Sequence, residues 1–189
     1  MPNKLPSSEA VATTPEPAAP PRKIYEVVKY GDPVLEKPGK PVTNFDAELE
    51  ELVEDMFATM YAAQGVGLAA PQIGKSIRLT VVDVTGGKNP EAKIVLINPE
   101  ITPVGQPVAG PEGCLSFPGL FVNVRRAKKV VIEAFDLAGN PVQLEAEGLA
   151  SRAWQHELDH LEGVVFTDRF STLARLANSR STSVWVRMH

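Results

Sequence analysis

The first clear pattern in the chain is a helical spacing of apolar residues between positions 43 and 64. Large apolar side chains recur there at intervals of three and four, which places them on one face of an α-helix. They are Phe45, Leu49, Leu52, Val53, Met56, Phe57 and Met60. Thr43 or Asn44 can cap the start of this helix, with Asp46 in its first turn. Gly65 and Gly67 end it.

Strand-like spacing follows the first helix. Stretches 77–84, 93–98 and 128–147 are rich in β-branched residues, and the last contains the turn sequence Ala138-Gly139-Asn140-Pro141. A second helix is predicted from Leu149 to Glu162 and stops before Gly163. Because helices and strands are segregated rather than strictly alternating, we predict a single α+β domain with a mainly antiparallel sheet.

Length and composition narrow the class of protein. The 189 residues suit one domain, and 43% apolar with 22% charged residues is typical of a globular protein. A net charge of −4 gives no general attraction to nucleic acid, and one cysteine excludes an intrachain disulfide. No apolar run reaches the roughly 18 residues of a membrane helix, and no signal peptide is evident. We therefore expect a cytoplasmic protein that has no membrane partner.

The two ends of the chain differ from its middle. Residues 1–22 are rich in Pro and Ala and poor in large apolar side chains, so we interpret them as a flexible tail. We expect residues 23–170 to form the one folded domain, which would carry any active site. Residues 171–189 form a basic C-terminal segment, because arginines but no acids follow Asp168.

The strongest chemical signal lies in the second predicted helix, as His156-Glu157-Leu158-Asp159-His160. Histidines four apart share one helix face and can bind one metal ion, while Glu157 can reach a water molecule held there. The plain alternative is a surface helix that carries two histidines by chance.

A third protein ligand is needed for a catalytic metal site. A third histidine six residues after His160 would complete one metallopeptidase pattern, but Phe166 stands there. No glutamate follows Glu162, Asp168 is a weak substitute, and His189 is the last residue. Cys114 remains, although a lone cysteine is often only a small buried apolar residue. Cysteine with two histidines suits zinc and ferrous iron equally.

A glycine-rich segment, Gly65 to Gln72, is the third signal. It half-matches the dinucleotide fingerprint, but it follows a helix and contains Pro71, so we reject a nucleotide site. A plain glycine turn is one alternative. The other is that the glycines let a peptide backbone approach while the Gln72 side chain donates a hydrogen bond.

Together these segments resemble the signatures of bacterial-type peptide deformylases, G-x-G-L-A-A-x-Q, E-G-C-L-S and Q-H-E-x-D-H. They stand here in the same order at 65–72, 112–116 and 155–160, and the resemblance extends from Ile24 to Phe170. It implies an α+β domain in which the metal helix packs against antiparallel strands. It also implies hydrolysis of the formyl group on the N-terminal methionine of new proteins, with release of formate.

The resemblance also assigns roles to residues. Cys114, His156 and His160 would bind the metal, usually Fe²⁺, with Zn²⁺, Ni²⁺ or Co²⁺ as substitutes. Glu157 would be the general base and acid, and Gln72 and the Leu115 N–H would receive the oxyanion. The remaining assignments are a peptide cleft at Gly65 and Gly67 and a methionine pocket formed by Val66, Leu149 and Ala153. We expect the substrate to lie extended along a strand edge near 65–67.

Neighbours of these residues carry further expectations. Glu112 is expected to pair with Arg126 and to orient the cysteine loop. Arg152 departs from the apolar residue expected beside the pocket, and we expect its head to reach solvent.

Partners and rival functions complete the sequence-based hypotheses. The resemblance implies nascent formyl-methionyl peptides as substrate and ribosome contact through the basic C-terminal segment. A solvated terminal face is the alternative, which the helix-poor stretch 179–183 favours. We expect a monomer. The rival functions are another metal-dependent peptidase or amidase, and a non-catalytic metal-binding or thiol-sensing protein.

Overall fold

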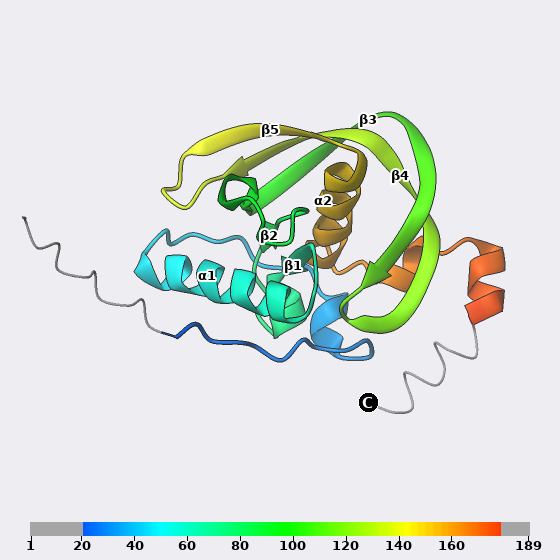
Figure 1. The fold of residues 1–189 in the computed structure, drawn as a ribbon, viewed down its shortest axis with the longest axis horizontal. Coiled ribbons are helices and arrows are strands. Elements are labelled where there is room, and N and C mark those ends of the chain that lie inside the picture. Colours follow the sequence, from blue (N-terminus) through cyan, green and yellow to red (C-terminus); the bar gives the residue numbers. More distant parts are fainter. Residues whose placement is uncertain (1–20, 179–189) are drawn as a thin grey trace, which may run out of the picture.

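A five-stranded antiparallel sheet curves around one central helix in the computed structural model, which describes residues 21–178 (Figure 1). The strands are β1 (Gly67–Ala69), β2 (Leu79–Val82), β3 (Ile94–Cys114), β4 (Phe117–Phe135) and β5 (Pro141–Glu147), and they are adjacent in sequence order. The helices are α1 (Ala47–Ala62) and α2 (Gly148–Leu161), with short 3₁₀ turns η1 (Pro33–Glu36), η2 (Ala70–Ile73), η3 (Pro90–Ala92) and η4 (Phe166–Arg169). The α+β class predicted from the sequence is confirmed.

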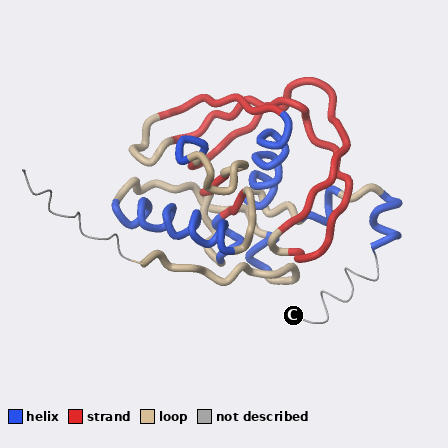
Figure 2. The backbone as a smooth tube through the Cα atoms, viewed as in Figure 1, coloured by secondary structure: helices blue, strands red, loops and turns tan. Residues whose placement is uncertain are grey.

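The longest feature is the hairpin of β3 and β4, which bends around α2 and carries its tight turn toward the base of that helix (Figures 1 and 2). The sequence analysis did not assign residues 99–127 to strands. Four prolines interrupt the alternating pattern of β3, at 99, 103, 107 and 111. Only residues 94–97 of β3 pair with β2, so these prolines lie on a stretch with a free edge, where a missing N–H is tolerated.

Helix α1 begins later and ends earlier than predicted. Neither Thr43 nor Asn44 caps it: the Oδ1 of Asp46 accepts from the Leu49 N–H at 3.1 Å and is the N-cap. At the other end Gln64 adopts a left-handed conformation with φ of 57°, which turns the chain into the glycine-rich segment. The predicted apolar face of this helix packs on β1 and β2. Met56 and Met60 of the helix belong to the same buried cluster as Leu68 of β1.

A second apolar layer fills the space between α2 and the concave face of the sheet. It includes Leu96, Val130, Ile132 and Trp154, all buried. A third cluster surrounds Cys114 with aromatic side chains, among them Phe117 and Phe166. Ala150, Ala153 and Trp154 thus fix the N-terminal half of the site-bearing helix by apolar contacts.

Two expectations concern the ends of the chain, which the structure describes only in part. Residues 1–20 and 179–189 lie outside the described structure, so the tail at 1–22 and most of the basic segment at 171–189 stay predictions. Residues 172–178 are helical. No helix among residues 21–178 is both long and apolar enough to span a bilayer.

One buried carboxylate ties α1 to the end of β2 and generates a stability prediction. Asp83 accepts hydrogen bonds from the Tyr61 hydroxyl at 2.6 Å and from the Thr85 and Gly87 N–H groups at 2.7 and 2.8 Å. Burial alone would raise the pKa of Asp83, but the hydrogen bonds from Thr85, Tyr61 and Gly87 outweigh burial and lower that pKa to about 2.

We predict that Asp83→Asn lowers the free energy of unfolding by about 1–3 kcal/mol near pH 7, since the bonds to an ionised acceptor are lost. Because the folded-state pKa is depressed, this contribution is complete above the ordinary value of 3.8 and fades as the pH falls toward 2. Urea unfolding of both proteins at pH 7, 4 and 2.5 measures the difference. A difference that stays constant over this range would contradict the prediction.

Candidate metal centre and catalytic cavity

Two side chains of helix α2, Ser151 and Gln155, form hydrogen bonds to the backbone of β4. The last register pair between β4 and β5 is Lys129 with Glu147, so the backbone of Ala127 extends past the end of β5. The N–H of Ala127 donates to Gln155 Oε1 at 3.0 Å, and its carbonyl accepts from Ser151 Oγ and Gln155 Nε2, both at 2.9 Å. The helix therefore takes over the pairing that β5 gives up, and His156 follows directly on Gln155.

Three metal-ligating side chains meet at this position. Cys114 is the last residue of β3, while His156 and His160 come from successive turns of α2. Their ligand atoms all lie within 4.8 Å of one another, and Cys114 Sγ is 3.3 Å from His160 Nε2. All three side chains are buried. A thiolate with two imidazoles is a donor set that suits a divalent transition metal, so the residues present fit a metal ion.

The electrostatics of the cluster favour the thiolate form of Cys114. Burial raises the pKa of the thiol, but the imidazoles of His160 and His156 outweigh burial and hold that pKa well below its usual range. A thiolate is the form that binds a metal. The sole cysteine is therefore prepared for ligation rather than simply packed in the core.

Glu112 connects the ligands to the surrounding fold. Its carboxylate accepts from Arg126 Nη2 at 2.6 Å and lies 2.7 Å from His156 Nδ1, which leaves Nε2 of that histidine for the metal. Burial would raise the pKa of Glu112, but hydrogen bonds from His156 and Arg126 lower it to about 2. The pairing of Glu112 with Arg126 expected from the sequence is present. Arg126 also binds Asp159 at 2.6 Å, a contact that sequence reasoning missed.

The expectation for Arg152 was wrong. Its side chain is only 15% exposed, and its head turns inward instead of reaching solvent. The guanidinium donates to Glu112 Oε2 at 3.1 Å and to backbone carbonyls of the β3–β4 hairpin. Because the hairpin was not predicted, these acceptors could not be foreseen from the sequence.

Glu157 lies beside the ligand cluster with one carboxylate oxygen free. The side chain is 4% exposed, and Oε2 has no hydrogen-bond partner within the described residues. Burial raises the pKa of Glu157 to about 7. A Cβ on Gly67 would overlap this carboxylate, so a larger residue there would push Glu157 from its present position. An unpartnered, buried carboxylate at a cavity is suited to hold and transfer a proton.

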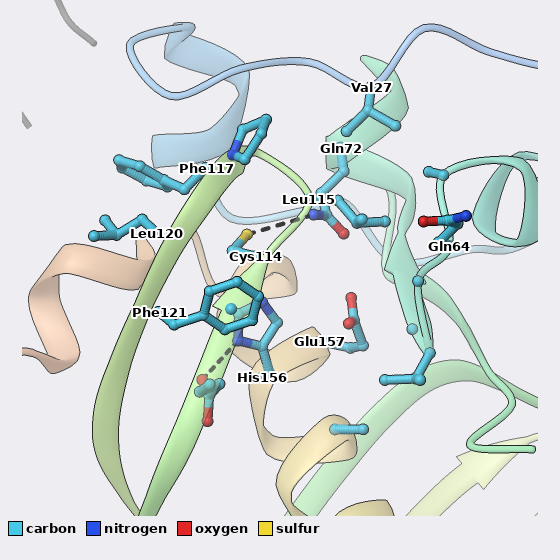
Figure 3. A pocket seen from close by; sticks show the side chains of 18 of the residues that line it. Val27, Gln64, Gln72, Cys114, Leu115, Phe117, Leu120, Phe121, His156 and Glu157 are labelled. Atoms are coloured by element: carbon cyan, nitrogen blue, oxygen red, sulfur yellow. Dashed lines mark hydrogen bonds and ion pairs between the residues drawn. The ribbon is translucent and has the colours of Figure 1, made fainter. Parts of the chain in front are cut away.

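The amide of Gln72 is oriented by its own turn. Its Oε1 accepts from the Ala69 N–H at 2.9 Å, so Nε2 points to Cys114 Sγ at 3.7 Å and to Ser116 Oγ at 3.3 Å (Figure 3). Leu115 lies in the two-residue turn between β3 and β4. Gln72 and Leu115 thus approach the sulfur from two separate elements.

The segment before η1 braces both of these elements, and sequence reasoning missed it. The Val28 N–H donates to the Gln72 carbonyl at 2.8 Å, and the Tyr30 N–H donates to the Ser116 carbonyl at 3.0 Å. Between them, Lys29 Nζ donates to the Leu115 carbonyl at 3.3 Å. These contacts join residues 44 to 86 positions apart, and no local sequence signal indicates them.

A cavity of about 560 Å³ opens beside the ligands, and Figure 3 shows its labelled side chains. All five residues assigned to substrate binding line it: Gly65, Val66, Gly67, Leu149 and Ala153. Gln72, Cys114, Leu115, His156 and Glu157 line it as well, whereas His160 does not. Lining residues that the sequence did not suggest include Val27, Lys29, Gln64, Leu120 and Phe121.

Comparisons with known proteins agree with this arrangement. The sequence model of the family described as polypeptide deformylase matches residues 24–176. A peptide deformylase of Acidobacterium capsulatum is 53% identical over 152 residues, which cover 80% of this chain and 89% of that protein. One from Thermotoga maritima is 46% identical, covering 81% of this chain and 91% of the relative.

Solved structures give the same result. A crystal structure of a peptide deformylase from Legionella pneumophila matches with a TM-score of 0.79 and 44% identity, covering 87% of this chain and 96% of that one. A plant enzyme, peptide deformylase 1B of Arabidopsis thaliana, matches with a TM-score of 0.81 and 39% identity over 84% of this chain and 88% of its own. The chain therefore belongs to the polypeptide deformylase family, metal-dependent hydrolases that remove the N-terminal formyl group from nascent polypeptides.

Proposed function

We propose that this chain hydrolyses N-formyl-methionyl peptides with Cys114, His156 and His160 as metal ligands and Glu157 as general base and acid. The observation that carries the assignment of Glu157 is its buried carboxylate oxygen without a partner, beside the three convergent ligands. Such an oxygen is costly to bury unless another group meets it during function.

The metal that we propose is Fe²⁺, with Zn²⁺, Ni²⁺ or Co²⁺ as substitutes. One thiolate and two imidazoles accept each of these ions, and the buried thiolate is the softest donor of the set. When bound, the ion would act as a Lewis acid that lowers the pKa of a water molecule to about 7. The hydrogen bond from His156 to Glu112 keeps that imidazole in one orientation.

Glu157 moves the proton in the proposed reaction. It accepts a proton from the water molecule that attacks the formyl carbon, and it donates this proton to the amine nitrogen as the carbon–nitrogen bond breaks. Formate and a free methionine amine result. The water-poor surroundings of the carboxylate strengthen its interactions with the reacting groups.

The oxygen of the formyl group gains negative charge in this step. We assign its stabilisation to Gln72 Nε2 and to the backbone N–H of Leu115, each worth about 3–4 kcal/mol in the transition state. The bond from the Ala69 N–H to Gln72 Oε1 supports the Gln72 assignment, because it keeps the donor end of the amide directed at the cavity.

The peptide is proposed to pair with β1, which forms one end of the sheet and has a free edge. Main-chain pairing reads a peptide without demanding particular side chains. Val66, Leu149 and Ala153 then surround the methionine side chain, whose burial contributes roughly 1.5–3 kcal/mol.

Three wider expectations remain predictions of the sequence. They are a cytoplasmic location, a monomeric state and contact of the basic segment 171–189 with the ribosome, of which the last falls mostly outside the described residues.

The first test is a comparison of substrates. We expect formate release from formyl-Met peptides to exceed cleavage of acetyl-Met peptides by at least about 100-fold, since a formyl carbon carries only hydrogen where an acetyl methyl would need space. Formate is measured with a coupled dehydrogenase, and acetate by chromatography. Equal or reversed rates would indicate a general amidase instead.

Glu157→Gln tests the proton carrier. We expect kcat to fall by about 10²- to 10⁴-fold, because the amide cannot accept the proton, while metal content per chain stays unchanged. Glu162→Gln is the matched control, since Glu162 lies just after the same helix and binds Arg78 away from the cavity. A Glu157→Gln protein with more than a tenth of the parent kcat would refute the role.

Metal analysis tests the ligands and the ion. We expect one Fe²⁺ per chain after anaerobic purification, and loss of metal in Cys114→Ser because a hydroxyl is a poor substitute for a thiolate. Removal of metal with a chelator should lower the thermal midpoint of the parent but not of Cys114→Ser, since only the folded parent binds the ion tightly. A Cys114→Ser protein that retains the full metal content would refute the assignment.

A further inference from the structure

Arg152 makes an unusual set of contacts for a side chain in a cavity wall. From α2 it donates through Nη1 to the Val124 carbonyl at 2.9 Å and through Nη2 to the Val108 carbonyl at 3.0 Å. Val108 belongs to β3 and Val124 to β4. One guanidinium group therefore joins the helix to both strands of the long hairpin.

This part of the hairpin has little other support from the sheet. β3 pairs with β2 only over residues 94–97, and β4 pairs with β5 only from residue 129 onward. Between these limits and the tight turn, the hairpin is a ribbon of two strands. A two-stranded ribbon is marginally stable by itself, so its position depends on what anchors it.

The guanidinium of Arg152 packs directly against the backbone of Gly110. A Cβ at this position would lie 2.8 Å from Arg152 Nη2 and 3.1 Å from Cζ, which is too close for both groups to keep their places. Gly110 is not among the residues with positive φ, so its backbone would accept alanine. The absence of a side chain at position 110 is therefore matched to the presence of arginine at position 152.

The anchored ribbon forms one wall of the cavity. Pro111, Glu112 and Gly113 follow Gly110 directly, and all three line the cavity together with Leu149 and Ala153 of α2. Arg152 reaches from the α2 wall of the cavity to the β3 wall, where it bonds Glu112 and the Val108 carbonyl. Any movement of the ribbon away from α2 changes the width of the space assigned to the methionine side chain.

We infer that Arg152 is a positioning residue that clamps the β3–β4 ribbon to α2 and thereby sets the width of the methionine pocket. The inference rests on the proposed function, because it refers to the methionine pocket of that site. Arg152 acts through the ribbon and not on the reacting atoms.

A role as the counter-ion of Glu112 is the competing explanation. Arg152 does reach Glu112 Oε2 at 3.1 Å. Arg126, however, already binds both oxygens of Glu112, at 2.6 and 3.1 Å, and its side chain is more deeply buried. Glu112 keeps a bidentate partner without Arg152, whereas within the described residues no other side chain of α2 donates to the carbonyl of Val108.

Two variants disturb the clamp in different ways, and one serves as control. Arg152→Met keeps an unbranched stem and removes the guanidinium. Gly110→Ala keeps the arginine but places a methyl group where the guanidinium now lies. Arg125→Met is the matched control: Arg125 Nη2 donates to the Pro107 carbonyl at 3.0 Å on the exposed side of the same ribbon and does not line the cavity. Each protein is assayed with its metal bound on formyl-Met-Ala-Ser and formyl-Phe-Ala-Ser peptides.

For Arg152→Met and Gly110→Ala we expect KM for the methionine peptide to rise at least about fivefold with kcat within about twofold. The preference for methionine over phenylalanine, as a ratio of kcat/KM, should fall at least about threefold because the wider pocket excludes the larger ring less well. Metal content and the Arg125→Met control should match the parent.

Unchanged KM and unchanged selectivity in both clamp variants would overturn the inference, even if they were less stable. A fall in kcat with loss of metal would also overturn it, because that result identifies Arg152 as support for Glu112 and the ligands. An inactive parent on both peptides would instead refute the proposed function, so the two failures are distinguishable.

Discussion

The carboxylate of Glu112 is the contact on which the site depends. It lies on β3 and binds Arg126 of β4, His156 of α2 and Arg152 of the same helix. A buried charge is stable only if it is paired and fully hydrogen-bonded, so these elements can assemble in few other ways. Replacing Arg126, its bidentate partner, would break a buried ion pair, which costs about 3–5 kcal/mol. The network holds Cys114, two residues further along β3, at the helix that bears both histidines.

Helix α2 and the β3–β4 hairpin each contribute different residues to the cavity. Apolar contacts and the two side-chain bonds to Ala127 fix the position of α2, and hence of Glu157, on the sheet. The hairpin contributes the cysteine ligand and the backbone N–H of Leu115, because β3 ends at Cys114 and the turn that follows contains Leu115. The proposed chemistry needs a metal ligand, a proton carrier and a backbone donor within one small volume, and the helix and the hairpin supply all three.

The sequence predicts the chemistry of this protein better than its shape. His156, Glu157 and His160 were evident because the period of a helix converts spacing into direction, and elimination together with family resemblance led to Cys114. The stretch 99–127 was not assigned because prolines at every fourth position disrupt the alternation by which strands are found. Without that hairpin, the inward turn of Arg152 and the bracing contacts of Val28 and Tyr30 could not be deduced, since they depend on long-range packing.

The same prolines give the free edge of β3 properties opposite to those of the β1 edge. In the proposed binding mode the edge of β1 stays open, because a peptide that is recognised through its main chain needs unpaired backbone groups to bind. The edge of β3 beyond residue 98 is longer and would invite pairing with other chains. Pro99, Pro103, Pro107 and Pro111 remove N–H groups along it, so a strand laid against this edge would lack donors at regular intervals. A composition that hides the strand from sequence analysis therefore also makes the β3 edge a poor template for pairing, which supports the proposal that the substrate pairs with β1.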